Sequence, residues 1–160
     1  MRVCALISGG KDSCYNAMQC VAHGHTLVCL ANLHPPANVG ELDSYMYQSV
    51  GSDAIELYGQ AAGGLPVYRR QIDGIPLQLR QEYRSGYENE EDTRSVHEEQ
   101  RGDKTAAEYS PDGSCGDGAY DEVEDLSELL RDVMNNESIE AIAVGAIFSD
   151  YQRIRVENVA

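Results

Sequence analysis

Apolar residues gather in short blocks along this chain, and the lengths of these blocks suit buried strands. A nearly continuous apolar run covers residues 2–7 and ends in Ser8-Gly9-Gly10, and a second run covers residues 26–33. Runs of this length without alternation are typical of strands buried on both faces of a parallel sheet. Residues 139–148 have the same character, and residues 66–72 predict a further strand because Val67 and Tyr68 have high strand propensity. The pattern therefore predicts four strands.

A helical period separates the first two runs. Residues 11–22 place apolar side chains at the i, i+3, i+4 and i+7 positions of one face, which is the pattern of an amphipathic helix. These side chains are Cys14, Ala17, Met18 and Val21. Gly24 marks the end of the helix. A strand, a glycine-rich turn, a helix and a strand within about 30 residues predict a βαβ unit.

Further helices are predicted in the rest of the chain. Residues 45–50 and 54–62 predict two short helices, with Ser52 or Asp53 available as an N-cap. A longer helix is predicted after residue 121 from an apolar stripe formed by Val123, Leu126, Leu130, Val133 and Met134. Ser149 and Asp150 resemble an N-cap that opens a last helix at residue 151. Strands that alternate with helices predict an α/β fold, a Rossmann-like parallel sheet flanked by helices.

The negative charge of the chain is concentrated in one segment. The 160 residues carry a formal net charge of −15, and residues 82–125 contain 15 acidic and 4 basic side chains. Between Leu79 and Leu126 there is no Leu, Ile, Met or Phe. A segment this poor in large apolar groups buries too little to offset its ordering entropy. We therefore expect a disordered acidic insertion over residues 85–118, with an acidic docking segment as the alternative.

Composition excludes several classes of protein. The five cysteines show no C-x-x-C pair, which argues against a zinc or iron–sulfur site and favours reduced thiols packed as small hydrophobes. No apolar run approaches the roughly 18 residues of a membrane span, and the amino terminus does not resemble a signal peptide. The chain also lacks the clustered positive charge of a nucleic-acid surface. We expect a cytoplasmic protein that binds neither membranes nor nucleic acid.

Residues 8–13, with the sequence Ser-Gly-Gly-Lys-Asp-Ser, carry the clearest chemical signal. Two glycines let backbone N–H groups approach a ligand, and the start of the following helix directs partial positive charge to the same place. Lys11 adds a full positive charge. The segment is not a Walker A loop, because Ala5 and Asp12 stand where that motif needs Gly and Ser or Thr. The loop predicts a polyphosphate site, and the plainer alternative is a Gly-Gly turn with a surface lysine.

This hexapeptide resembles the signature of the PP-loop, or N-type ATP pyrophosphatase, family. Enzymes of that family cleave ATP between the α and β phosphates and activate a carboxylate or carbonyl as an adenylate, which a nitrogen or sulfur nucleophile then attacks. The resemblance implies that the loop holds the pyrophosphate part of ATP and that Asp12 helps to position Mg²⁺, although a carboxylate there also favours the helix start. The ATP-binding residues so implied are Ser8, Gly9, Gly10, Lys11, Asp12 and Ser13.

Three stretches narrow the family. Residues 145–159, 1–20 and 41–48 (Glu-Leu-Asp-Ser-Tyr-Met-Tyr-Gln) are similar to the diphthine–ammonia ligase family. The resemblance implies ATP-dependent amidation of the diphthine carboxylate on elongation factor 2 by ammonia, giving diphthamide, AMP and pyrophosphate. The chain ends at Ala160, before the Glu-Gly-Gly-Glu motif of that family, so we expect only a partial PP-loop ATP-binding domain. The alternatives are an ATP-binding module without complete activity, or another PP-loop enzyme such as a tRNA thiolase or an NAD synthetase-like amidase.

Further site residues follow from the strand ends. The carboxyl ends of parallel strands meet at one crevice, so we expect Asn32, Leu33, Gly145 and Ser149 to contact the nucleotide. The resemblance implies catalytic roles for four side chains, and places Asp150 beside Asp12 as a Mg²⁺ ligand. These four are Lys11, Asp12, Asp150 and Arg153. The alternative for the last two is an N-capped helix whose arginines pair with Glu157 or face solvent.

Overall fold

The computed structural model describes residues 1–37, 39–40, 42, 44, 46–75, 120–146 and 149–160. The insertion predicted at residues 85–118 and Cys115 lie outside the described residues. The elements, in chain order, are β1 (Arg2–Leu6), α1 (Lys11–Ala22), β2 (Thr26–His34), the 3₁₀ turn η1 (Ser52–Ala54), α2 (Ile55–Ala61), β3 (Val67–Gln71), α3 (Glu122–Asn136), β4 (Ala141–Ala143) and α4 (Asp150–Val159).

The four strands form one sheet in the order β3-β2-β1-β4, and every neighbouring pair is parallel. Cys4 of β1 pairs with Cys29 of β2, and Ala5 of β1 pairs with Ala143 of β4. The predicted Rossmann-like fold is confirmed. The chain runs from β1 outward to β3 and then returns to the far side of β1, so the strand order reverses between β1 and β4. In open α/β sheets this reversal is where ligands bind, beyond the carboxyl ends of the strands.

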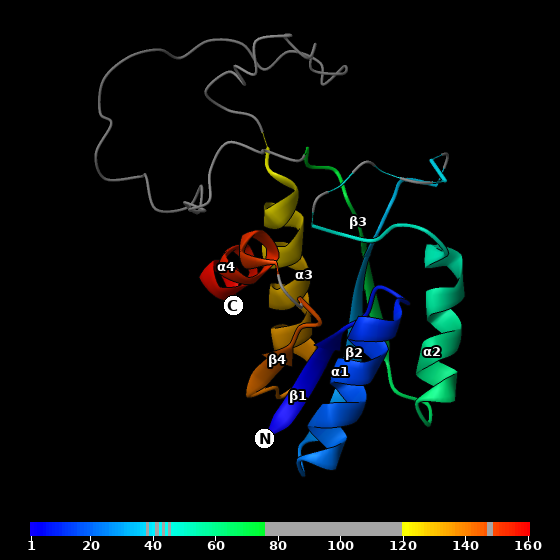
Figure 1. Cartoon of the computed structure of the whole chain (residues 1–160), viewed down its shortest axis with the longest axis vertical. Coiled ribbons are helices and arrows are strands. Elements are labelled where there is room, and N and C mark those ends of the chain that lie inside the picture. Colours follow the sequence, from blue (N-terminus) through cyan, green and yellow to red (C-terminus); the bar gives the residue numbers. More distant parts are fainter. Residues whose placement is uncertain (38, 41, 43, 45, 76–119, 147–148) are drawn as a thin grey trace, which may run out of the picture.

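Helices cover both faces of the sheet (Figure 1). Val3 and Ala5 of β1 pack in one apolar cluster with Ala17 of α1 and Ile55 of α2. Cys4 faces the other way, into a larger cluster that includes α3 and α4 residues. Right-handed crossovers explain this division, because connections that advance across a sheet in opposite directions lie on opposite faces. None of the helices in the described part of the chain is long and apolar enough to cross a membrane.

The buried face of α1 differs from the predicted stripe. Ala17 is buried together with Ser13, whereas Met18 and Val21 are 67% and 54% exposed. The helix therefore contacts the sheet through its smallest side chains. Met134, the last member of the stripe predicted for α3, is also exposed, while Leu129 takes a buried place that the stripe omitted.

The helix predicted at residues 45–50 is wrong, since residues 46–50 have no helical conformation. The hydroxyl of Ser44 accepts hydrogen bonds from the backbone N–H groups of Met46 and Tyr47, at 3.1 and 2.9 Å. Short polar side chains that bond nearby backbone in this way compete with helix formation. The predicted caps are also wrong: η1 begins after Gly51, which has a positive φ of 74°, and neither η1 nor α2 has a side-chain cap.

Candidate functional site

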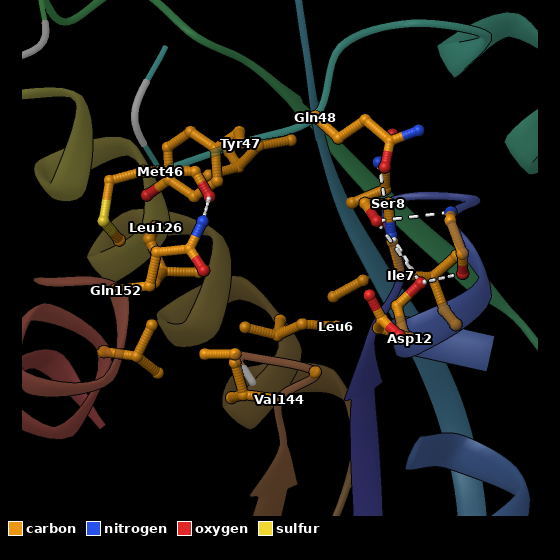
Figure 2. Close-up of a pocket in the computed structure, with 18 of the residues that line it drawn as sticks. Leu6, Ile7, Ser8, Asp12, Met46, Tyr47, Gln48, Leu126, Val144 and Gln152 are labelled. Carbon is orange, nitrogen blue, oxygen red and sulfur yellow. Dashed lines mark hydrogen bonds between the residues drawn. The ribbon is translucent and has the colours of Figure 1, made fainter. Parts of the chain in front are cut away.

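A cavity of about 510 Å³ lies at the carboxyl ends of β1, β2 and β4 (Figure 2). Its polar end is formed by the loop after β1, with Ser8 and Asp12 at the wall. Its apolar end lies near Leu126 of α3 and Val144 after β4. A concave site with an apolar part and a few convergent polar groups is typical of small-molecule binding. The strand order places this cavity at the reversal between β1 and β4.

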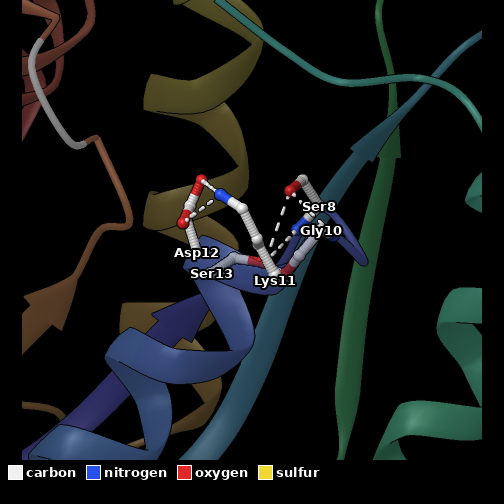
Figure 3. Close-up of polar contacts among 5 residues, drawn as sticks. All are labelled: Ser8, Gly10, Lys11, Asp12 and Ser13. Atoms are coloured by element: carbon white, nitrogen blue, oxygen red, sulfur yellow. Dashed lines mark hydrogen bonds and ion pairs between the residues drawn. The ribbon is translucent and has the colours of Figure 1, made fainter.

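The loop of residues 8–13 is held by its own hydroxyls (Figure 3). The Ser13 hydroxyl donates to the Gly10 carbonyl at 3.0 Å and accepts from the Ser8 N–H at 3.3 Å. Gly10 is the N-cap of α1 and provides no side-chain cap. The amino-terminal end of α1, with its partial positive charge, therefore lies at the cavity without a side chain of its own over it. Lys11 and Asp12 line the cavity and form an ion pair of 2.7 Å at the surface.

Glycine is needed at position 9 because of the backbone conformation and the contact with α2, and not because the residue lines the cavity. Its φ is +81°, and a Cβ there would lie 2.9 Å from the Ile55 Cδ1 atom. The Tyr58 hydroxyl donates to the Gly9 carbonyl at 2.9 Å. Helix α2 thus supports the loop from the side away from the ligand space. Gly9 is not among the residues that line the cavity.

Gly145 lies against the backbone at the start of α1. A Cβ at this position would lie 2.8 Å from the Ser13 N atom and 2.9 Å from the Ser13 Cα atom. The sequence predicts Gly145 as a place where a nucleotide approaches the backbone. The structure shows that the backbone of α1 already lies against Gly145, so only glycine allows the ends of β4 and α1 to meet. Gly145 also lines the cavity.

Asn32 and Leu33 line the cavity, as predicted from the end of β2. The Asn32 amide donates to the Ile7 carbonyl at 2.8 Å, and its oxygen accepts from the Arg69 Nε at 3.2 Å. Arg69 also donates to the Ser52 carbonyl at 2.9 Å. Sequence reasoning did not single out Arg69. Its position opposite Asn32 on the neighbouring strand becomes evident only from the register of β2 and β3.

Helix α4 brings a different set of residues to the cavity than the sequence predicts. Ser149 is the N-cap of α4 and accepts from the Gln152 N–H at 3.3 Å. Asp150 pairs with Arg153 at 3.2 Å, and Arg153 pairs with Glu157 at 2.9 Å on the exposed side of the helix. None of Ser149, Asp150 and Arg153 lines the cavity. The wall includes Gln152 and Val156 of this helix instead.

The segment Met46, Tyr47 and Gln48 forms a wall of the cavity that sequence reasoning did not assign. The Gln152 amide donates to the Met46 carbonyl at 3.0 Å, which ties this segment to α4. The Tyr47 hydroxyl donates to the Glu122 carbonyl at 3.3 Å. The signal in the sequence was the stretch 41–48, which carries the family resemblance but no recognisable chemical pattern.

The carboxylate of Glu122 fastens the same segment from α3. Its Oε2 accepts from the Ser44 hydroxyl at 2.7 Å, and Ser44 in turn accepts from the backbone of residues 46 and 47. Glu122 is only 1% exposed. Burial raises the pKa of this carboxyl group, against the lowering effect of the Ser44 hydrogen bond. Burial likewise raises the pKa of Tyr47 well above its usual range, so the phenol stays a hydrogen-bond donor.

The acidic side chains of the site are few. Within the described residues, Asp12 is the only carboxylate on the cavity wall. That part of the chain also contains no group of three His, Cys, Asp or Glu side chains able to hold a metal ion. This donor set does not fit an ion held by protein alone. It fits Mg²⁺ carried by phosphates and water, which needs only one or two carboxylates.

Comparison with known proteins identifies the relatives of this chain. The human (Homo sapiens) diphthine–ammonia ligase is 53% identical over 162 residues, which cover 99% of this chain and 48% of that protein. The zebrafish (Danio rerio) diphthine–ammonia ligase is 48% identical and is covered to 50%. The chain is a homologue of the diphthine–ammonia ligases. A further member, from Saccharomyces cerevisiae, is 38% identical over 161 residues and is covered to 19%. No protein-family model matches the chain.

The chain spans about half the length of the vertebrate diphthine–ammonia ligases that it matches, namely their amino-terminal part. Since the match covers 99% of the chain, it includes the loop of residues 8–13, the segment 46–48 and α4. These three parts of the cavity wall are therefore all within the region shared with this ligase family.

Proposed function

We propose that this chain binds ATP and supplies the adenylating part of a diphthine–ammonia ligase. The observation that carries the proposal is the loop of residues 8–13, which turns the uncapped start of α1 and the Lys11 side chain toward a cavity at the strand-order reversal. Backbone N–H groups at a helix start, together with a lysine, suit the phosphates of a nucleotide. Homology to enzymes named diphthine–ammonia ligase gives the reaction class.

In the proposed reaction, the diphthine carboxylate of elongation factor 2 attacks the α-phosphorus of ATP, and pyrophosphate leaves. Ammonia then attacks the carbonyl carbon of the adenylate, loses a proton, and displaces AMP to leave the amide. Adenylation is needed because the oxygen of a free carboxylate is a poor leaving group. Lys11 and the start of α1 stabilise the charge that develops on pyrophosphate.

The two ends of the cavity suit the two parts of the proposed nucleotide. The phosphates lie at the loop, and the less polar part of the nucleotide extends along Leu33 and Val144 toward Leu126. Asp12 is the residue that would hold a Mg²⁺ ion bound to the phosphates, and such an ion would neutralise phosphate charge. Asp150 and Arg153 remain in the proposal as catalytic residues from the family resemblance alone.

We also propose a cytoplasmic location. Four cysteines in the described residues, Cys4, Cys14, Cys20 and Cys29, form no disulfide, and free thiols suit a reducing compartment.

The proposal is tested with the 160-residue chain in two assays. In the first, ATP binding is measured by calorimetry in the presence of Mg²⁺, and failure to bind ATP contradicts the proposal. In the second, the chain is incubated with ATP, ammonia and elongation factor 2 bearing diphthine. Amide formation with AMP and pyrophosphate supports the whole reaction, whereas ADP and orthophosphate contradict it. ATP binding without amide formation assigns the chain an ATP-binding role and leaves the amidation to the region that the longer relatives possess.

A further inference from the structure

The side chain of Gln48 lies over the loop of residues 8–13. A Cβ at Gly10 would lie 2.6 Å from the Gln48 Oε1 atom, so the carboxamide rests directly on that glycine. Figure 2 shows the Gln48 side chain lying next to Ser8 at the loop. Gln48 comes from a segment distant in sequence, and it lines the cavity at its polar end.

The carboxamide of Gln48 is available for a ligand. Among the described residues it makes no hydrogen bond, and its residue is exposed. The terminal torsion of a glutamine side chain is broad, so the amide can turn its N–H groups toward an anion at small cost. An amide supplies two donors and no charge.

The backbone on each side of Gln48 is anchored. Before it, the Tyr47 N–H donates to the Ser44 hydroxyl at 2.9 Å. After it, the Ser49 hydroxyl accepts from the Leu42 N–H at 2.9 Å, and Ser49 is 3% exposed. A side chain on a backbone held at both neighbours approaches the loop from a fixed direction, so less ordering entropy is lost when it binds.

We propose that Gln48 contacts the phosphates of the bound nucleotide, donating a hydrogen bond from beside the start of α1, where its carboxamide lies against Gly10. The inference rests on the proposed function, because it takes the loop to be the phosphate site. The inference assigns a chemical role to the stretch 41–48, whose sequence pattern alone indicates no chemical role. Gln48 adds a hydrogen-bond donor to the proposed phosphate site without adding charge.

The test uses two variants that distinguish the hydrogen-bond donors of the Gln48 amide from the shape of the side chain. Gln48→Met keeps the length of the side chain and removes both donors, and Gln48→Glu keeps the shape and places a negative charge over the loop. Calorimetry with ATP and with inorganic pyrophosphate, each with Mg²⁺, should show affinity three- to tenfold lower for Gln48→Met. The loss for Gln48→Glu should exceed tenfold. Adenosine should bind both variants as it binds the unsubstituted chain.

The matched control is Gln60→Ala, an exposed glutamine on α2 that does not line the cavity. Its affinity for every probe should equal that of the unsubstituted chain. If Gln48→Met or Gln48→Glu binds ATP and pyrophosphate normally, the inference is overturned and the proposed function stands. If the unsubstituted chain binds neither probe, the proposed function fails and the inference fails with it. Equal losses for adenosine and pyrophosphate would show a packing role and also overturn the inference.

Discussion

The Gln152 amide donates a hydrogen bond to the Met46 carbonyl at 3.0 Å, across 106 positions of sequence. This contact joins α4 to the segment that forms one wall of the cavity, and both residues line the cavity themselves. A buried or half-buried bond of this kind contributes about 1 kcal/mol. It is one of the places where two of the three sequence stretches typical of the family meet.

We expect Gln152→Ala to lower ATP affinity roughly fivefold, because the wall segment loses its tie to α4. Calorimetric titration with ATP measures the change. Asn158→Ala is the control, since Asn158 is an exposed residue of the same helix that lies outside the cavity wall. Affinity unchanged in Gln152→Ala would show that the segment is held by its α3 contacts alone.

Lys11→Ala should weaken ATP binding about tenfold at low salt and less at high salt. The side chain is 86% exposed and, among the described residues, pairs only with the adjacent Asp12, so its charge is available to phosphates but screened by ions. Binding of adenosine should not change. Lys11→Arg should recover part of the loss. The control is Arg131→Ala, which removes a positive charge on α3. An equal loss of adenosine affinity would contradict a phosphate role.

Gly145→Ala should destabilise the fold by about 1–3 kcal/mol, the usual cost of overpacking. The added methyl group would lie 2.8 Å from the Ser13 N atom, and backbone cannot yield as a flexible side chain does. Gly40→Ala is the matched control, because a Cβ there meets nothing within 4 Å and its φ is not positive. Urea denaturation of both variants measures the difference. Equal stability would mean that β4 and α1 can separate freely.

Ser149 and Asp150 should differ in their effects on stability. Ser149→Ala removes the N-cap of α4 and should cost about 1 kcal/mol. Asp150→Ala should leave the melting temperature nearly unchanged, because Asp150 makes only an exposed ion pair. Pyrophosphate release from the same Asp150→Ala protein then tests the role that the family resemblance implies. Full release per folded molecule would remove Asp150 from the proposed catalytic residues.

Stability should fall as pH rises above the ordinary pKa of a glutamate, because of Glu122. Burial raises the pKa of this group in the folded protein. In the window between the ordinary and the raised pKa, the native state binds a proton that the unfolded state does not, so rising pH favours unfolding. Glu122→Gln keeps an acceptor for Ser44 and should raise the melting temperature at pH 7. Denaturation curves across pH measure it, and an unchanged pH profile in Glu122→Gln would contradict the assignment.

The sequence by itself determined the alternation of strands and helices and the position of the loop of residues 8–13. Helix α1 was predicted at its observed bounds, because the glycine pair before Lys11 and Gly24 after Ala22 mark the two ends of its pattern. The helix predicted at 45–50 failed because Ser44 captures the local N–H groups, a contact stabilised by Glu122 from 78 positions away. Local periodicity carries no information about such distant partners.

Only the tertiary structure decided which residues form the cavity. A strand order of β3-β2-β1-β4 brings the loop of residues 8–13 beside Gly145, as the convergence of parallel strand ends predicts. The rotation of α4 was not predictable, because its apolar pattern is weak and its orientation is set by the buried ion pair of Arg155 with Asp121. That pairing turns Gln152 and Val156 to the cavity and leaves Arg153 at the surface. A side chain's place on a helix follows from spacing, but the direction of that face follows from what the helix packs against.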